Sequence, residues 1–166
     1  HLMYEEVRAA VDVPVLHIAD ATAERIKTAG LSSIGLLGTA YTMEQPFYRG
    51  RLEAEHGLEA LVPDAAGRAD VHRIIYDELV QGIVTDASWT AYVTVVERLI
   101  ERGAAGVIAG CTENSAVLLQ LSTTNASAAA CASSPHTAPT SIAVAQFAIV
   151  FAPLSSATVA LSSTAW

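Results

Sequence analysis

Short apolar runs alternate with longer segments of helical period along the first 113 residues. The runs that predict buried parallel strands are Val13–Ile18, Ile34–Leu37, Leu58–Val62 and Gly106–Ala109. Between them, apolar residues recur at spacings of three and four, as Val71, Ile74 and Ile75 do, and this spacing predicts amphipathic helices. Strands separated by such helices require right-handed crossovers. The pattern therefore predicts an α/β fold with a parallel sheet of about four strands flanked by helices.

Punctuating residues predict where the helices begin and end. Four glycines are expected to end helices, namely Gly30, Gly57, Gly82 and Gly103. The expected N-caps are Asp20, Thr42 and Asp86, and Thr42 has capping-box spacing to Gln45 in a helix that carries Pro46 in its first turn. Pro63-Asp64 is expected to turn the chain into another helix. A further helix is expected over Leu2–Ala10.

Two loops follow predicted strands and carry small or reactive residues. Gly38-Thr39 follows one strand, and Cys111-Thr112-Glu113 follows another. Because the carboxyl ends of parallel strands share one edge of a sheet, we expect Thr39 and Cys111 at the same edge, where helix N-termini can hold an anion such as a carboxylate. The Gly35–Thr39 run lacks the lysine of a P-loop and the third glycine of a dinucleotide fingerprint, which disfavours nucleotide binding.

Composition narrows the class of protein. The chain has 166 residues, 52% of them hydrophobic, and a net charge of −8, which disfavours nucleic acid as a partner. The two cysteines, Cys111 and Cys131, form neither a disulfide framework nor a metal-ligand pattern, so a reducing cytoplasm and no metal are expected. The uncharged stretch 141–161 contains Gln146 and Pro153, and no membrane span is expected there.

The last 53 residues, 114–166, differ in composition from the rest. They contain no Lys, Arg, Asp or Glu, and Ala, Ser and Thr occupy 30 of the 53 positions. Neither a helical nor a strand period persists, so we expect a separate segment that packs poorly, and a change of reading frame is one explanation for it.

Several sequence blocks together resemble one enzyme family. They are Val13–Thr22, Gly35–Thr39, Tyr41–Glu44, His72–Leu79 and Gly110–Glu113. From about Met3 to Glu113, the chain resembles the aspartate/glutamate racemases, whose two similar α/β lobes each contribute a cysteine followed by a threonine. The resemblance implies a remnant of the first lobe over residues 1–19, the second lobe over 20–113 and a tail of other character over 114–166.

The resemblance also implies a chemistry without a cofactor. Racemisation removes an α-proton from one face of an amino acid and returns a proton to the other face, so two acid/base groups must flank the carbon. Cysteine serves as thiolate and as thiol. By resemblance, Cys111 is a catalytic residue, Thr39 and Thr112 hold the substrate's α-carboxylate or amino group, and Glu113 orients the loop.

The chain also departs from the family pattern. The first-lobe Cys-Thr block of the family precedes the segment equivalent to residues 1–6, so this chain carries one of the two thiols and its own activity is left open. Near Gln81, aspartate-directed members tend to carry a lysine, which leaves the side-chain preference open. A homodimer is left open as well.

Two alternatives to the racemase remain. One is a single-thiol decarboxylase or isomerase of the same superfamily, and the other is a non-catalytic remnant that binds an anion. The remaining polar and aromatic candidates are interpreted as ordinary structural residues: His17 as a hydrogen-bonded histidine of the core or its rim, His72 and Glu78 as part of a solvated helix surface, and Trp89 and Tyr92 as helix packing.

Overall fold

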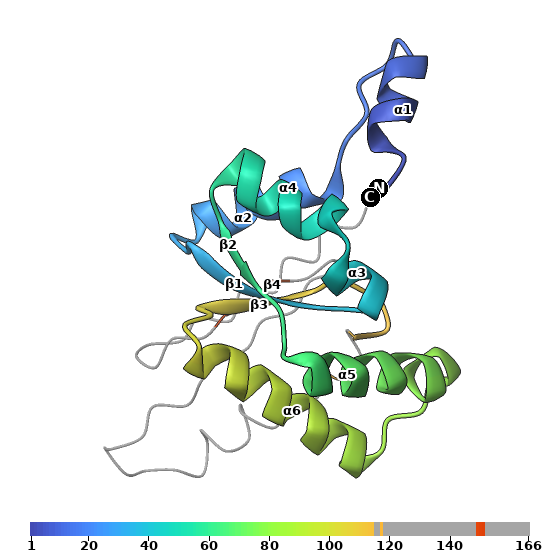
Figure 1. Cartoon of the computed structure of the whole chain (residues 1–166), viewed down its shortest axis with the longest axis vertical. Coiled ribbons are helices and arrows are strands. Elements are labelled where there is room, and N and C mark those ends of the chain that lie inside the picture. The colour runs from blue at the N-terminus through green and yellow to red at the C-terminus, as the bar shows by residue number, and fades with distance from the viewer. Residues whose placement is uncertain (115–116, 118–148, 152–166) are drawn as a thin grey trace.

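The computed structural model describes residues 1–114, 117 and 149–151 (Figure 1). Its helices are α1 (Tyr4–Ala10), α2 (Ile18–Thr28), α3 (Ala40–Glu44), α4 (Pro46–His56), α5 (Ala65–Asp77), the short 3₁₀ helix η1 (Leu79–Gln81) and α6 (Asp86–Glu101). Its strands are β1 (Ser33–Leu37), β2 (Glu59–Leu61), β3 (Gly106–Ala109) and β4 (Ile149–Phe151).

The strands form one sheet in the order β2-β1-β3-β4. β1 pairs in parallel with β2 and with β3, while β4 pairs antiparallel with β3. The predicted α/β fold is therefore confirmed, with three parallel strands where about four were expected. The prediction that residues 114–166 pack poorly concerns a segment that lies largely outside the described residues. Of this segment, the structure describes Asn114, Val117 and β4.

Helices cover both faces of the sheet. Figure 1 shows α2 and α4 on one side and α5 and α6 on the other. Along β1 and β3, Ile34, Leu36 and Ile108 pack with α2 and α4, whereas Leu37 and Val107 join the core under α5 and α6. This alternation follows from the two-residue period of a strand. At Gly35 a Cβ atom would lie 3.0 Å from Leu99 Cδ1, so glycine allows α6 to pack closely on the sheet.

The predicted strand Val13–Ile18 is wrong. Residues 12–17 form no strand, and Ile18 is already the first residue of α2. The His17 ring accepts a hydrogen bond from Ala19 N at 3.1 Å and thereby caps the helix. Both edges of β1 are already paired with β2 and β3, so β1 offers no edge for another strand. Val13 and Leu16 are 68% and 82% exposed, which shows that an apolar run does not by itself define a buried strand.

The helix ends follow the glycines, but most helix starts differ from the prediction. Gly30, Gly57, Gly82 and Gly103 all have positive φ, although Gly82 follows η1 and not α5. The chain turns into α5 at Pro63-Asp64, as expected, and Asp64 is the N-cap of this helix.

The three residues predicted as N-caps are wrong. In each helix, a side chain earlier in the sequence accepts the hydrogen bond from an amide of the first turn. His17, Thr39 and Thr85 cap α2, α3 and α6 in place of Asp20, Thr42 and Asp86. Pro46 starts a separate helix. A proline disfavours the helical conformation at the residue before it, and the backbone at Gln45 is extended.

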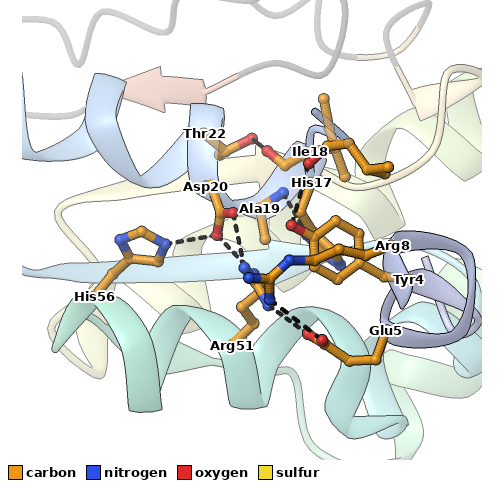
Figure 2. A network of polar contacts seen from close by, with 11 residues as sticks. Tyr4, Glu5, Arg8, His17, Ile18, Ala19, Asp20, Thr22, Arg51 and His56 are labelled. Atoms are coloured by element: carbon orange, nitrogen blue, oxygen red, sulfur yellow. Dashed lines mark hydrogen bonds and ion pairs between the residues drawn. The ribbon is translucent and has the colours of Figure 1, made fainter. Parts of the chain in front are cut away.

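An ion-pair network joins the first two helices to α4 (Figure 2). Arg51 donates to both carboxylate oxygens of Asp20, at 2.6 and 2.9 Å, and His56 Nε2 lies 2.8 Å from Asp20 Oδ1. The same guanidinium lies 3.6 Å from Glu5 and over the Tyr4 ring. These contacts attach α1 to the α2/α4 layer. The hydrogen bond from Arg51 is the main reason that the pKa of Asp20 falls to about 2.

This network predicts an acid-dependent loss of stability. Because the folded-state pKa of Asp20 lies below its usual value of 3.8, the pair stabilises the protein above about pH 4, and the contribution is lost as pH falls towards 2. Solvent screens the partly exposed pair, so we expect Asp20→Asn to reduce the free energy of unfolding at pH 7 by about 1 kcal/mol. Urea unfolding at pH 7 and pH 2.5 measures this.

Asp12→Asn is the matched control, since Asp12 is exposed and forms no ion pair within the described part of the chain. Equal stabilities of the two variants at pH 7, or an Asp20→Asn deficit as large at pH 2.5 as at pH 7, would contradict the assignment.

Candidate active site

The loops after β1 and β3 meet at one edge of the sheet. Leu37 and Ala109 are aligned in the parallel pair β1–β3, so the chain leaves both strands at the same level. The Leu37 carbonyl accepts hydrogen bonds from Gly110 N at 2.6 Å and from Asn114 Nδ2 at 3.3 Å. The expectation that Thr39 and Cys111 emerge at the same edge is therefore confirmed.

Two glycines allow this close approach. A Cβ atom at Gly110 would lie 3.0 Å from both Leu37 O and Thr42 Cγ2, and one at Gly38 would lie 3.0 Å from Thr42 Cβ. Any larger residue would push the two loops and the first turn of α3 apart. The small residues that the sequence places here thus permit contact between loops.

Thr39 caps the helix that follows β1. Its Oγ1 accepts from Thr42 N at 3.3 Å and lies 3.2 Å from Thr42 Oγ1. The next amide, Ala40 N, donates to His72 Nδ1 of α5 at 3.1 Å. Since Nδ1 accepts this bond, the neutral ring carries its proton on Nε2. His72 therefore supports the Thr39 loop, a role that sequence analysis missed because no local pattern indicates a contact across 32 residues.

The Glu113 carboxylate accepts hydrogen bonds from two side chains of the loop that follows β3. Cys111 Sγ donates to Glu113 Oε2 at 2.6 Å, and Thr112 Oγ1 donates to the same oxygen at 3.0 Å. The carboxylate thus fixes both side chains within one turn of backbone. Asn114, which is fully buried, extends the loop towards β1 through its bond to Leu37 O, and the described residues provide no partner for its Oδ1.

The environment of Cys111 favours the protonated thiol. Burial is the largest cause and the hydrogen bond to Glu113 the second, and together they raise the pKa of the Cys111 thiol to about 11. The backbone amides of Glu113 and Thr112 act in the opposite direction. The same hydrogen bond lowers the pKa of Glu113. At neutral pH the site therefore presents a thiol beside a carboxylate, which is a proton donor with a proton acceptor next to it.

Other candidate sites lie elsewhere or do not form in the described part of the chain. A surface hollow of about 460 Å³ lies between the end of β2 and helices α5 and α6, lined by Asp64, Arg68, Arg98 and Arg102 among others, and it includes none of the predicted site residues. Within residues 1–114, 117 and 149–151, no three metal-ligating side chains come together, and no helix is long and apolar enough to cross a bilayer.

The contact with Glu113 predicts a change in thiol reactivity. Glu113→Gln keeps an acceptor for the Cys111 S–H group but removes the negative charge, so the thiol pKa should fall by about one unit and alkylation by iodoacetamide at pH 8 should become roughly tenfold faster. The rate is measured in a Cys131→Ser background, in which Cys111 is the only thiol.

Glu97→Gln, an exposed change on α6, is the control and should leave the rate unchanged. A Glu113→Gln rate equal to that of the background would show that the carboxylate does not hold the thiol proton.

Comparison with known proteins supports a family assignment. The model of the Asp/Glu/hydantoin racemase family matches residues 1–147. An uncharacterised protein of Pectobacterium carotovorum, encoded in the pnlA 3′ region, is 27% identical over 117 residues, which cover 70% of this chain and 76% of that protein.

Two solved structures are similar in fold and in sequence. The crystal structure of a Yersinia pestis protein that is assigned to the Asp/Glu racemases matches with a TM-score of 0.66 and 51% identity. An aspartate racemase homologue from Pyrococcus horikoshii matches with a TM-score of 0.61 and 39% identity. Each match covers 68% of this chain and 49% of the other, so the similar region is about half of each solved chain. The chain belongs to the Asp/Glu/hydantoin racemase family.

Proposed function

We propose that Cys111 is a proton-transfer residue of an amino-acid racemase that needs no cofactor. The observation that carries the proposal is the hydrogen bond from Cys111 Sγ to Glu113 Oε2 at the edge shared with the Thr39 loop. A thiol whose pKa lies near 11 keeps its proton at neutral pH, yet thiols still transfer protons to carbanions, whose conjugate acids are weaker still. The family membership supports the same chemistry.

The neighbouring groups have complementary roles in this proposal. Thr39 and Thr112 bind the substrate's α-carboxylate or amino group. The Thr112 hydroxyl points its proton at Glu113, so its lone pairs are free to accept from the substrate ammonium group. Glu113 orients Cys111 and relays a proton from solvent to it between turnovers. The substrate is a small amino acid, aspartate or glutamate being the first candidates, in a cytoplasmic enzyme.

Inversion needs a second acid/base group on the opposite face of the α-carbon. In the described part of the chain, Cys111 is the one free thiol, and Glu113 lies on the same side of the site. By resemblance to the family, the second thiol of the proposed two-thiol mechanism comes from the other lobe. For exchange, Cys111 first loses its S–H proton to solvent, the thiolate takes the α-proton, and after exchange with solvent the same thiol returns a proton to the same face of the carbanion. We therefore expect the 166-residue chain by itself to exchange the α-proton from one face without detectable inversion.

Two other functions remain candidates. A single-thiol decarboxylase would need one proton donor to quench the carbanion left by carbon dioxide, and the protonated Cys111 suits that step. A non-catalytic lobe would use the amides of the Thr39 loop and the threonine hydroxyls to bind a carboxylate only. Each makes a different prediction for Cys111.

Deuterium incorporation tests the proposal directly. The chain is incubated with L-aspartate or L-glutamate in D₂O, and incorporation at Cα is followed by proton NMR together with chiral analysis. We expect incorporation with retained configuration, and a loss of about 10²-fold or more in Cys111→Ala, because a general acid/base typically contributes that much. Cys131→Ser is the matched control and should retain the activity.

The outcomes separate the three functions. Exchange that survives Cys111→Ala would contradict the role of the thiol. Cys111-dependent decarboxylation of a malonate without amino-acid exchange would favour the single-thiol enzyme. Carboxylate binding with neither reaction would favour the anion-binding lobe.

A further inference from the structure

Tyr92 of α6 is buried with an unsatisfied hydroxyl group. Its side chain is 0% exposed, and no described residue forms a hydrogen bond with its Oη. The other buried tyrosine provides a contrast, since the Tyr48 hydroxyl donates to Thr22 Oγ1 at 3.2 Å. A buried hydroxyl without a partner costs free energy, whereas phenylalanine would fill the same volume without that cost. The Tyr92 hydroxyl therefore needs an explanation beyond packing.

The packing of α6 places Tyr92 at the level of the candidate site. Ala105 N donates to Ser33 O just after α6 ends, so the C-terminal end of α6 lies at the amino end of β1. Leu99 packs over Gly35, and Tyr92 lies two turns earlier, about 10 Å nearer the other edge. Three residues of strand also span about 10 Å, so a residue two turns before Leu99 on α6 lies at about the level of Gly38. Figure 1 shows α6 running along the sheet beside β1 and β3.

The Tyr92 side chain extends further in the same direction. Long side chains on a helix lean towards its N-terminus, which in α6 means towards the edge that carries Cys111. Gly38 is aligned with Gly110 by the β1–β3 register, and Cys111 follows directly. Cys111 packs against the same core cluster that contains Tyr92, and the charge of the ionised thiol is one of the factors that raise the pKa of Tyr92, after burial.

Deprotonation changes what the Cys111 sulfur requires. As a thiol, it donates to Glu113. As a thiolate, it can only accept, and the neighbouring carboxylate repels it. The sulfur must then turn towards hydrogen-bond donors, and the buried phenol of Tyr92 is a neutral donor with no competing partner among the described residues.

We propose that Tyr92 is a positioning residue whose hydroxyl donates a hydrogen bond to Cys111 whenever the cysteine is a thiolate. The inference rests on the function proposed above for Cys111. When the S–H bond breaks, the proton forms a bond to the substrate carbanion through the carbanion's electron pair, and the sulfur keeps the S–H pair as a thiolate. Tyr92 remains protonated throughout and stabilises that thiolate until a proton returns to it.

Thiol reactivity tests this without any substrate. In the Cys131→Ser background, Tyr92→Phe removes only the hydroxyl, and the iodoacetamide alkylation rate of Cys111 at pH 8–9 should fall about tenfold, which corresponds to a rise of about one pKa unit. The thermal unfolding midpoint should stay the same or rise, because the Tyr92 hydroxyl forms no hydrogen bond with any residue that the structure describes. An unchanged or faster alkylation rate in Tyr92→Phe would overturn the proposal.

Two further variants separate the hydroxyl from general packing. Tyr48→Phe loses a satisfied hydrogen bond on the other face of the sheet, so it should unfold at a lower temperature while Cys111 reacts at the background rate. Val95→Ala loosens the cluster that contains Tyr92 but leaves the hydroxyl in place, and it too should react at the background rate. A tenfold slower reaction in Val95→Ala would assign the effect to packing and overturn the role of the hydroxyl. Since alkylation requires no amino acid, a failure of the proposed racemase activity would not affect these results.

Discussion

The position of the candidate site depends on one carbonyl group. Leu37 O, at the end of β1, accepts one hydrogen bond from the backbone of the β3 loop and another from the Asn114 side chain. These bonds extend the parallel β1–β3 pairing by one step beyond the sheet. Gly110 makes the contact sterically possible, because a Cβ atom there would lie 3.0 Å from Leu37 O. Without it, the Thr39 and Cys111 loops would share an edge but would not be held against each other.

Electrostatics then determine what the thiol can do. Burial and the Glu113 carboxylate both favour the protonated form, so the site differs from those in which positive charge and helix amides generate a reactive thiolate. A racemase thiol must pass through both states. The Glu113 carboxylate raises the pKa of the thiol, whereas the backbone amides of Thr112 and Glu113 lower it. Whether the sulfur donates or accepts a proton therefore depends on which of these groups it faces.

Most of the fold could be predicted from the sequence because most helix ends and strands follow from the conformation or burial of a few neighbouring residues. Glycines that adopt positive φ ended the helices, and the two central strands, β1 and β3, were short and apolar. Val13–Ile18 failed because an exposed apolar segment has the same composition as a buried strand. For the site, the sequence predicted the cluster of adjacent residues Cys111–Glu113 and, from the parallel topology, the shared edge of Thr39 and Cys111. The contacts of His72 with Ala40 and of Asn114 with Leu37 join residues 32 and 77 positions apart, which no local pattern encodes.

The central claim is that Cys111 rests as a thiol held by Glu113. The most direct measurement is a titration of the Cys111 ¹³Cβ chemical shift by NMR in the Cys131→Ser chain with labelled cysteine. The account predicts a single transition with a midpoint of about 11 and a thiol shift throughout the neutral range. A midpoint at or below about 8.5, the value of an unperturbed cysteine, would contradict it.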